Sequence, residues 1–200
     1  MEPAIATATF ARSTTAAPTS PRLAPITRSW NPLVWIALAI YRSFGVTAPV
    51  QVIFARAPRL IIAHTILMAT AEYATSLDRR LSSLARVFGS RVNGCMFCDD
   101  LESRLAIEHR ALVREDVDAL AEYATSDRFS ERERAALRYV EELNTTRRAS
   151  DEVFAALKRH FSEREIVELT WLNAVGNYLN LQAKPLGLAP EGACEIPSRS

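Results

Sequence analysis

Apolar side chains recur at spacings of three and four residues over most of the chain from Trp30 onward. That spacing places them on one face of an α-helix, whereas a strand with one buried face would alternate apolar and polar residues. The clearest stripe is Leu81, Leu84, Phe88 and Val92. No stretch alternates long enough to make a convincing strand, and the 200 residues include only 6 glycines. The pattern therefore predicts an all-α domain.

Serine and glutamate pairs mark the beginnings of helices in the second half of the chain. Ser130 and Glu133 have the spacing of a capping box, in which each side chain accepts a hydrogen bond from a free backbone N–H. The pair Ser162 and Glu165 repeats this spacing. Ser150 precedes two acidic residues, which the helix dipole favours in a first turn. Helices are therefore expected to begin after these three serines.

Three further residues are expected to set the limits of helices. Asn93 should cap the helix that carries two neighbouring cysteines. Pro58 suits the first turn of an earlier helix, and Pro185 should end a long helix that begins at Glu163. The apolar face expected on the earlier helix consists of Ile62, Ile66, Ala69 and Tyr73. The apolar face expected on the long helix consists of Val167, Trp171, Ala174, Tyr178 and Leu181.

The composition changes along the chain. Before Trp30, the residues Ala, Thr, Ser and Pro dominate, and Glu2 is the only acidic side chain. Transit peptides share this composition, but so do plain tails that cannot bury enough apolar surface to fold. We expect residues 1–29 to be a disordered N-terminal tail, residues 30–190 to be one helical domain, and residues 191–200 to be a C-terminal tail.

Net charge and cysteine content limit the partners and the compartment. The chain has 24 basic and 23 acidic side chains, a formal net charge of +1, so no long-range field would attract nucleic acid or an anionic membrane. The longest apolar run, residues 33–40, is far shorter than the roughly 20 residues that a bilayer requires. Three cysteines do not make a secreted disulfide scaffold. We expect a cytoplasmic protein without nucleic-acid or membrane partners.

Cys95 and Cys98 are the strongest chemical signal, because they stand three residues apart where a helix is expected to begin. A pair at this spacing can bridge, and the free N–H groups and dipole of a first turn favour the thiolate form. Two alternatives remain open. The pair could be half of a zinc site, although a second close pair of ligands is missing, or it could simply pack in the core. We expect thiol–disulfide chemistry with no metal and no cofactor.

Several segments in a fixed order resemble the carboxymuconolactone decarboxylase and alkylhydroperoxidase-D (AhpD) superfamily. They are Leu77–Leu81, Arg91–Cys98, Phe129–Leu137 and His160–Thr170. The resemblance covers about residues 50–190. It implies an AhpD-like helical bundle that forms homo-oligomers and, in the branch with C-x-x-C, a peroxidase or disulfide oxidoreductase with peroxiredoxin-type antioxidant activity. The partners it implies are a small hydroperoxide substrate and an external thiol or dithiol reductant.

The same resemblance implies a proton relay from which this chain departs. Members of the branch usually carry a glutamate twelve residues before the first cysteine and a histidine four residues after the second. Ser83 and Glu102 stand at those positions. The resemblance assigns peroxide attack to Cys98, although Cys95 lies nearer the helix terminus, and Cys95 would then resolve the sulfenic acid. Glu102 is the candidate base, or alternatively a nearby negative charge that opposes thiolate formation.

Two other functions remain open. A lyase that acts on a small lactone acid would fit the superfamily name, but it has no evident need for the cysteine pair. A non-catalytic redox-responsive protein would fit the missing relay. His64 is a possible further site residue, although a histidine satisfied in the core or at the surface is the simpler interpretation. Trp171 and Tyr178 are interpreted as core or subunit contacts.

Overall fold

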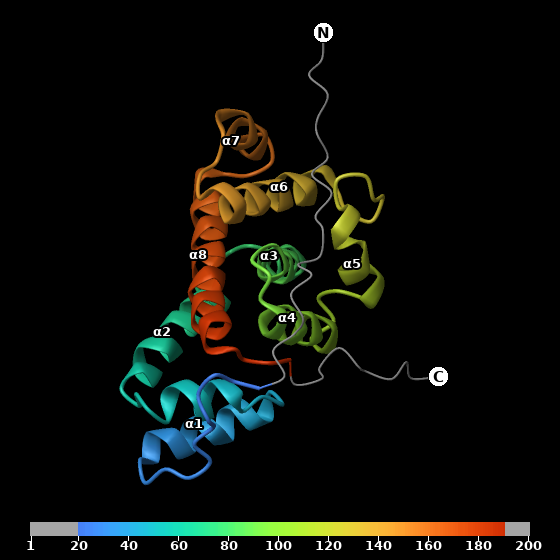
Figure 1. Cartoon of the computed structure of the whole chain (residues 1–200). Helices are drawn as coiled ribbons and strands as arrows, with labels where there is room; N and C mark the ends of the chain where they lie inside the picture. The colour runs from blue at the N-terminus through green and yellow to red at the C-terminus, as the bar shows by residue number, and fades with distance from the viewer. Residues whose placement is uncertain (1–19, 191–200) are drawn as a thin grey trace.

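The computed structural model describes residues 20–190, which form helices joined by turns with no strand among them (Figure 1). The prediction of an all-α fold is confirmed. The elements in chain order are α1 Pro32–Ser43, a π-helical turn η1 Val50–Phe54, α2 Leu60–Tyr73, α3 Arg79–Val92, α4 Met96–Glu108, α5 Arg114–Ala119, a 3₁₀ turn η2 Leu120–Glu122, α6 Glu131–Thr146, α7 Asp151–Lys158 and α8 Glu163–Leu186.

Helix α3 lies at the centre of the bundle, with α4, α6 and α8 packed around it (Figure 1). The stripe predicted for this helix is correct, because Leu81, Leu84 and Phe88 are all buried. They belong to the main core together with Leu137 of α6 and Leu169 of α8. Burial of a side chain of this size contributes about 1.5–3 kcal/mol. The core therefore holds α3 firmly up to its C-terminal end, where the cysteine segment begins.

Most of the predicted helix starts are present. Both capping boxes form, at Ser130 and at Ser162, and Ser150 caps α7. The expected cap at Asn93 is wrong. Asn93 is instead the C-cap of α3, and the sulfur of Cys95 caps α4.

The turn between α3 and α4 explains this correction. Gly94 has φ +63°, the left-handed conformation that commonly ends helices and that glycine adopts without strain. Its N–H donates to the carbonyl of Arg91 at 2.9 Å, and the N–H of Cys95 donates to the carbonyl of Ser90 at 2.9 Å. The chain must complete this turn before a new helix can begin, so the cap falls on Cys95.

The apolar faces predicted for α2 and α8 are largely exposed. On α2, Ile62 and Ile66 are 55% and 61% exposed, and on α8 Val167, Trp171 and Leu181 are exposed as well. Both helices carry apolar residues around most of their circumference, so spacing alone does not select the side that faces the core. The sides that are buried include Ala71 on α2 and Ile166, Leu169, Leu172 and Val175 on α8.

Pro185 does not end α8 as predicted. The helix continues to Leu186, and Gly187 closes it in a left-handed conformation with φ +66°. A proline in the last turn removes one helical hydrogen bond but leaves the preceding turns intact. The glycine therefore sets the end of the helix.

The segment before α1 lies against the helical body. The N–H of Arg22 donates to the last turn of α8 at 2.9 Å, and the N–H of Ile26 donates to η1 at 3.0 Å. Residues 20–29, which the sequence placed in the N-terminal tail, thus make specific backbone contacts. The remainder of that tail, residues 1–19, and the predicted C-terminal tail, residues 191–200 with Cys194, lie outside the described residues.

A buried carboxylate ties α3, α5 and the segment before α6 together. Asp116 is 3% exposed, and it accepts hydrogen bonds from Arg80 at 2.6 Å and from Arg128 at 2.9 Å. The backbone N–H of Val113 donates to the same carboxylate at 3.2 Å. Burial raises the pKa of Asp116, but the hydrogen bonds from Arg80, Val113 and Arg128 outweigh it and leave the pKa below its usual value. The carboxylate is therefore ionised and fully engaged at neutral pH.

We expect Asp116→Asn to lower the free energy of unfolding by about 2 kcal/mol at pH 7, because an amide N–H would face a guanidinium in a buried position. The matched control is Asp118→Asn, on the exposed side of the same helix, which should change stability by less than about 0.5 kcal/mol. The pKa of Asp116 is lower in the folded protein than in the unfolded chain. The stability difference between the unaltered protein and Asp116→Asn should therefore be present above the usual carboxyl pKa near 3.8 and disappear as the pH falls through the lower pKa of the folded state. Urea unfolding at several pH values measures this difference, and equal effects of the two variants would contradict the assignment.

Candidate active site

The cysteine pair forms a disulfide at the N-terminal turn of α4. The Cα atoms of Cys95 and Cys98 are 5.2 Å apart. Both residues are buried, with 2% and 5% exposure. Because Cys95 is the N-cap, its sulfur accepts a hydrogen bond from the N–H of Cys98 at 3.4 Å. A free N–H aimed at a sulfur stabilises the thiolate form of that sulfur after reduction.

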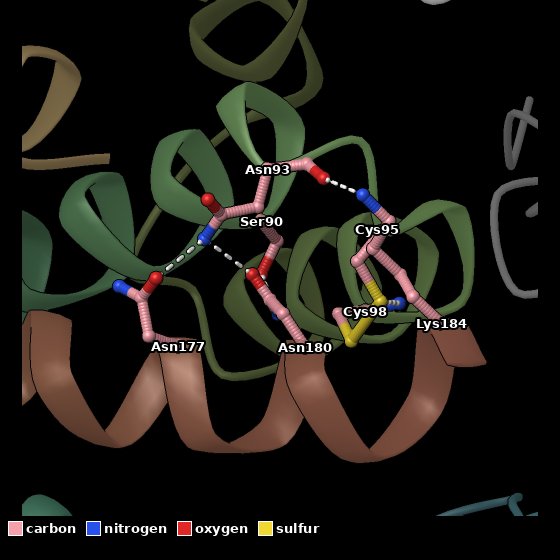
Figure 2. The surroundings of a disulfide bond; sticks show 7 residues. All are labelled: Ser90, Asn93, Cys95, Cys98, Asn177, Asn180 and Lys184. Atoms are coloured by element: carbon pink, nitrogen blue, oxygen red, sulfur yellow. Dashed lines mark hydrogen bonds between the residues drawn. A yellow bond between two sulfur atoms is a disulfide. The ribbon is translucent and has the colours of Figure 1, made fainter. Parts of the chain in front are cut away.

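Helix α8 holds the cysteine turn in place from the other side (Figure 2). The side-chain amide of Asn93 donates to Asn180 at 2.7 Å and more weakly to Asn177 at 3.3 Å. The ammonium group of Lys184 donates to the carbonyl of Asn93 at 2.5 Å. Asn180 also donates to the hydroxyl of Ser90 at 3.4 Å. The turn that positions the sulfurs is therefore fixed to both α3 and α8.

An apolar shell surrounds the disulfide. Its buried members, besides the cysteines, are Val46, Val52, Phe97, Ala183 and Leu188. The first two come from the segment between α1 and α2, so the N-terminal part of the chain covers the pair. Tyr41 of α1 packs against this shell and also against a second apolar cluster around Phe54. Electrostatic effects on the sulfurs are strong in such surroundings, because little water is present to screen them.

Glu102 is paired with an arginine of α3. Its carboxylate accepts a hydrogen bond from Arg86 at 3.0 Å, and Arg86 also pairs with Glu72 of α2 at 2.8 Å. Attraction to Glu102 raises the pKa of Arg86 above its usual value despite burial. Asp99, in the first turn of α4, is likewise paired with Arg91 of α3 at 3.2 Å. The acidic side chains that the sequence placed beside Cys98 thus face compensating positive charge.

The Glu102–Arg86 pair faces a small cavity of about 10 Å³, also lined by Met68, Ser90 and Gly176. A cavity of this size holds about one water molecule. The usual glutamate of α3 is replaced by Ser83 and the usual histidine of α4 by Glu102. The pattern implied by the resemblance has its carboxylate on α3. In this chain the carboxylate is Glu102 on α4, and it is paired with the cation of Arg86 on α3.

His64 is buried on α2 between two tyrosines. Its Nε2 atom lies 2.5 Å from the hydroxyl of Tyr41, and its Nδ1 atom lies 3.4 Å from the hydroxyl of Tyr178. The side chain of Gln182 donates to the hydroxyl of Tyr178 at 2.9 Å. Burial lowers the pKa of His64 to about 4. His64 is therefore a neutral, hydrogen-bonded histidine at pH 7, and Tyr41 is the neighbour that sequence reasoning missed.

Within residues 20–190, no group of three or more His, Cys, Asp or Glu side chains is arranged to hold a metal ion. Among the helices of that same part of the chain, none is long and apolar enough to cross a membrane.

Comparison with known sequences finds a family and two curated relatives. Residues 63–142 match the model of the carboxymuconolactone decarboxylase family. The uncharacterized protein YnjA of Escherichia coli is 29% identical over 131 residues, which are 62% of this chain and 71% of YnjA. The uncharacterized protein YdfG of Bacillus subtilis is 27% identical over 108 residues, which are 52% of this chain and 73% of YdfG.

Solved structures extend the similarity to most of the described helices. ATU0492 of Agrobacterium tumefaciens is a protein of unknown function with a proposed assignment as antioxidant defence protein AhpD. Its TM-score is 0.62 at 27% identity, and the similar region is 66% of this chain and 91% of the ATU0492 chain. The debrominase Bmp8 has a TM-score of 0.74 at 25% identity and covers 84% of this chain and 91% of its own. A peroxidase-related protein from Silicibacter sp. TM1040 has a TM-score of 0.72 at 17% identity and covers 90% of this chain and 96% of its own.

The fold and the cysteine turn define an AhpD-like helical bundle with a C-x-x-C pair at a helix start. The resemblance read from the sequence is therefore confirmed. Residues 63–142 are similar to the carboxymuconolactone decarboxylase family, and the Cys95–Cys98 pair fits the C-x-x-C branch of that family.

Proposed function

We propose that the protein is a thiol-dependent hydroperoxide reductase that cycles Cys95 and Cys98 between a dithiol and a disulfide. The observation that carries the proposal is the bridged pair at a capped helix start inside an apolar shell. In the cycle, two thiols and one hydroperoxide give one disulfide, one alcohol and one water. An external thiol or dithiol then reduces the disulfide, in a compartment such as the cytoplasm where such reductants are abundant.

The hydrogen bond within the pair supports a division of roles between the two sulfurs. The N–H of Cys98 donates to the sulfur of Cys95, so Cys95 is the better stabilised thiolate. A stabilised thiolate is the better leaving group in disulfide exchange. An external reductant would therefore attack the sulfur of Cys98 and expel Cys95. In the peroxide step we follow the family resemblance and propose that Cys98 attacks the hydroperoxide and that Cys95 resolves the sulfenic acid.

A second candidate is the reductive removal of halogen from a small aromatic compound. The similarity to the debrominase Bmp8 favours it, since that likeness also covers most of the chain. In this reaction two thiols and one aryl bromide would give one disulfide, the debrominated ring and hydrogen bromide. The cysteine pair and the reductant are the same in both candidates, whereas a lactone-acid lyase would leave the pair without a role.

The experiment that tests the proposal measures consumption of cumene hydroperoxide by the reduced full-length protein with excess dithiothreitol. A parallel assay follows bromide release from 2,3,4-tribromopyrrole under the same conditions. We expect catalytic peroxide consumption that is lost in the Cys95→Ser/Cys98→Ser double variant. Bromide release without peroxide consumption would support the second candidate instead. Activity of neither kind would favour a non-catalytic redox-responsive protein.

We also propose that the protein forms a homo-oligomer through its exposed apolar helix faces. Trp35 of α1, Ile66 of α2 and Trp171 of α8 are 57%, 61% and 43% exposed. Large apolar side chains that gather on the surface often mark an interface between proteins. Light scattering at micromolar concentration should give at least twice the 22.2 kDa chain mass. The double charge variant Ile66→Glu/Trp171→Glu should shift the mass towards the monomer, and a monomeric mass for the unaltered protein would contradict the proposal.

A further inference from the structure

A row of hydrogen-bonded side chains runs from the surface of α8 to the apolar shell of the cysteines. It consists of Gln182, Tyr178, His64 and Tyr41, in that order. The two ends lie in different surroundings. Tyr178 and Gln182 line an open groove on α8. Tyr41 packs against the cluster that contains both cysteines. The row therefore joins a solvent-accessible groove to the apolar cluster that contains both cysteines.

The aromatic rings hold this row in a fixed geometry. The ring of His64 lies 4.9 Å from that of Phe54, 5.9 Å from that of Tyr178 and 6.2 Å from that of Tyr41, measured between centroids. Phe54 is 1% exposed and Tyr41 packs on it at 6.2 Å. Side chains packed in this way keep their rotamers. The imidazole is thus held with one nitrogen towards each tyrosine hydroxyl.

A neutral imidazole in this position can be hydrogen-bonded in two ways. With the proton on Nε2, His64 donates to Tyr41 and accepts from Tyr178; with the proton on Nδ1, both bonds are reversed. Each arrangement satisfies both ring nitrogens. Because burial lowers the pKa of His64 to about 4, the imidazole carries a single proton at pH 7. Passing from one arrangement to the other moves one proton along the row.

We propose that Tyr41 donates the proton that the leaving group takes up at the cysteine site, and that His64 and Tyr178 resupply it from the groove. The inference rests on the proposed thiol chemistry and provides a route for proton transfer at a site where Ser83 and Glu102 stand in place of the usual relay glutamate and histidine. Tyr41 is the residue that meets the substrate. His64 and Tyr178 act through it and are positioning residues.

The proton balance of the peroxide step follows from this arrangement. The thiolate of Cys98 attacks the distal oxygen of the hydroperoxide, so that a sulfur–oxygen bond forms and the oxygen–oxygen bond breaks. The departing alkoxide takes the proton of Tyr41. Tyr41 regains a proton from Nε2 of His64 while Nδ1 receives one from Tyr178, which is reprotonated by water in the groove. Cys95 then attacks the sulfenic acid as a thiolate and displaces hydroxide. The hydroxide takes up the proton that the Cys95 thiol released when it ionised, and water leaves.

The test compares reagents that differ in their need for a proton. Cumene hydroperoxide releases a strongly basic alkoxide, peracetic acid releases a weakly basic carboxylate, and iodoacetamide releases iodide. His64→Gln keeps one donor and one acceptor but cannot pass a proton, and Tyr41→Phe removes the donor. We expect both variants to reduce cumene hydroperoxide about a hundredfold more slowly, within the range for a positioned acid or base. Reaction with peracetic acid and iodoacetamide should stay within about threefold of the unaltered protein.

Two substitutions at exposed positions serve as matched controls: His109→Gln and Tyr73→Phe, which should leave all three reactions unchanged. Equal slowing of all three reagents in His64→Gln and Tyr41→Phe would show a structural role and overturn the inference. No slowing with cumene hydroperoxide would overturn it as well. If the unaltered protein reduces neither peroxide, the proposed function itself fails, which is a separate outcome from an active protein with unaffected variants.

Discussion

Cys98→Ser is expected to abolish hydroperoxide turnover, with a loss of at least about a thousandfold in kcat/KM. A serine hydroxyl is not ionised at neutral pH, so the attacking thiolate is gone and the remaining groups contribute only binding and orientation. Coupled oxidation of a dithiol reductant in the presence of cumene hydroperoxide measures the rate. The fold should be retained in this variant, because the serine oxygen takes the place of the cysteine sulfur on an otherwise identical side chain.

Cys95→Ser should behave differently, and this contrast separates the two roles. The variant should consume about one hydroperoxide per chain and then stop, because the sulfenic acid at Cys98 has no partner to resolve it. Trapping with dimedone followed by peptide mass analysis would locate that sulfenic acid. Cys194→Ser is the matched control and should turn over normally. A single turnover in Cys98→Ser with trapping at Cys95 would reverse the proposed roles.

The second large effect concerns the ion pair between Glu102 and Arg86. We propose that this pair sets the charge near Cys98. Removing the carboxylate in Glu102→Gln leaves Arg86 paired with Glu72 alone. One negative charge near Cys98 is then lost, which should lower the pKa of the Cys98 thiol. Removing the cation in Arg86→Gln should raise that pKa. A shift of one pKa unit changes the thiolate fraction at neutral pH by about tenfold, so alkylation should quicken about tenfold in the first variant and slow about tenfold in the second.

Alkylation by iodoacetamide of chains in which Cys95 and Cys194 are both replaced by serine measures this shift at Cys98 alone. The double variant Arg86→Gln/Glu102→Gln should return close to the original rate, because Glu72 remains and the net charge of the group is the same as in the unaltered protein. Glu108→Gln makes the same change of charge near the far end of α4 and should have little effect. If Glu102→Gln instead slows peroxide turnover while alkylation quickens, Glu102 is the base of the reaction and not only a charge partner.

The sequence predicts the parts of the fold that depend on local rules. The two capping boxes and the stripe of α3 are confirmed because each depends on residues within one or two helical turns. The cap of α4 was misplaced because the left-handed turn at Gly94 moves the helix start from Asn93 to Cys95. The buried sides of α2 and α8 could not be chosen from spacing, since apolar residues occur on more than one side of each helix.

The candidate site likewise contains residues that the sequence reveals and residues that only the packing of helices brings together. The cysteine pair is visible in the sequence because its members are three residues apart. The partner of Glu102 is 16 residues away on another helix, and the two tyrosines bound to His64 are 23 and 114 residues away from it. Contacts of that kind depend on how helices pack, and no local spacing records them. The only sign in the sequence of this row of hydrogen-bonded side chains is His64, a lone histidine in an apolar helix. An ordinary core histidine would give the same sign.

The central claim is that one hydroperoxide converts the reduced pair to a Cys95–Cys98 disulfide. Its most direct test adds one equivalent of cumene hydroperoxide to the fully reduced full-length protein, quenches with iodoacetamide and maps the peptides by mass spectrometry. The account predicts loss of two hydrogens per chain, a bridge between Cys95 and Cys98, and Cys194 recovered in its alkylated form. Full alkylation of Cys95 and Cys98 after the peroxide has been consumed, or a dominant bridge that includes Cys194, would contradict it.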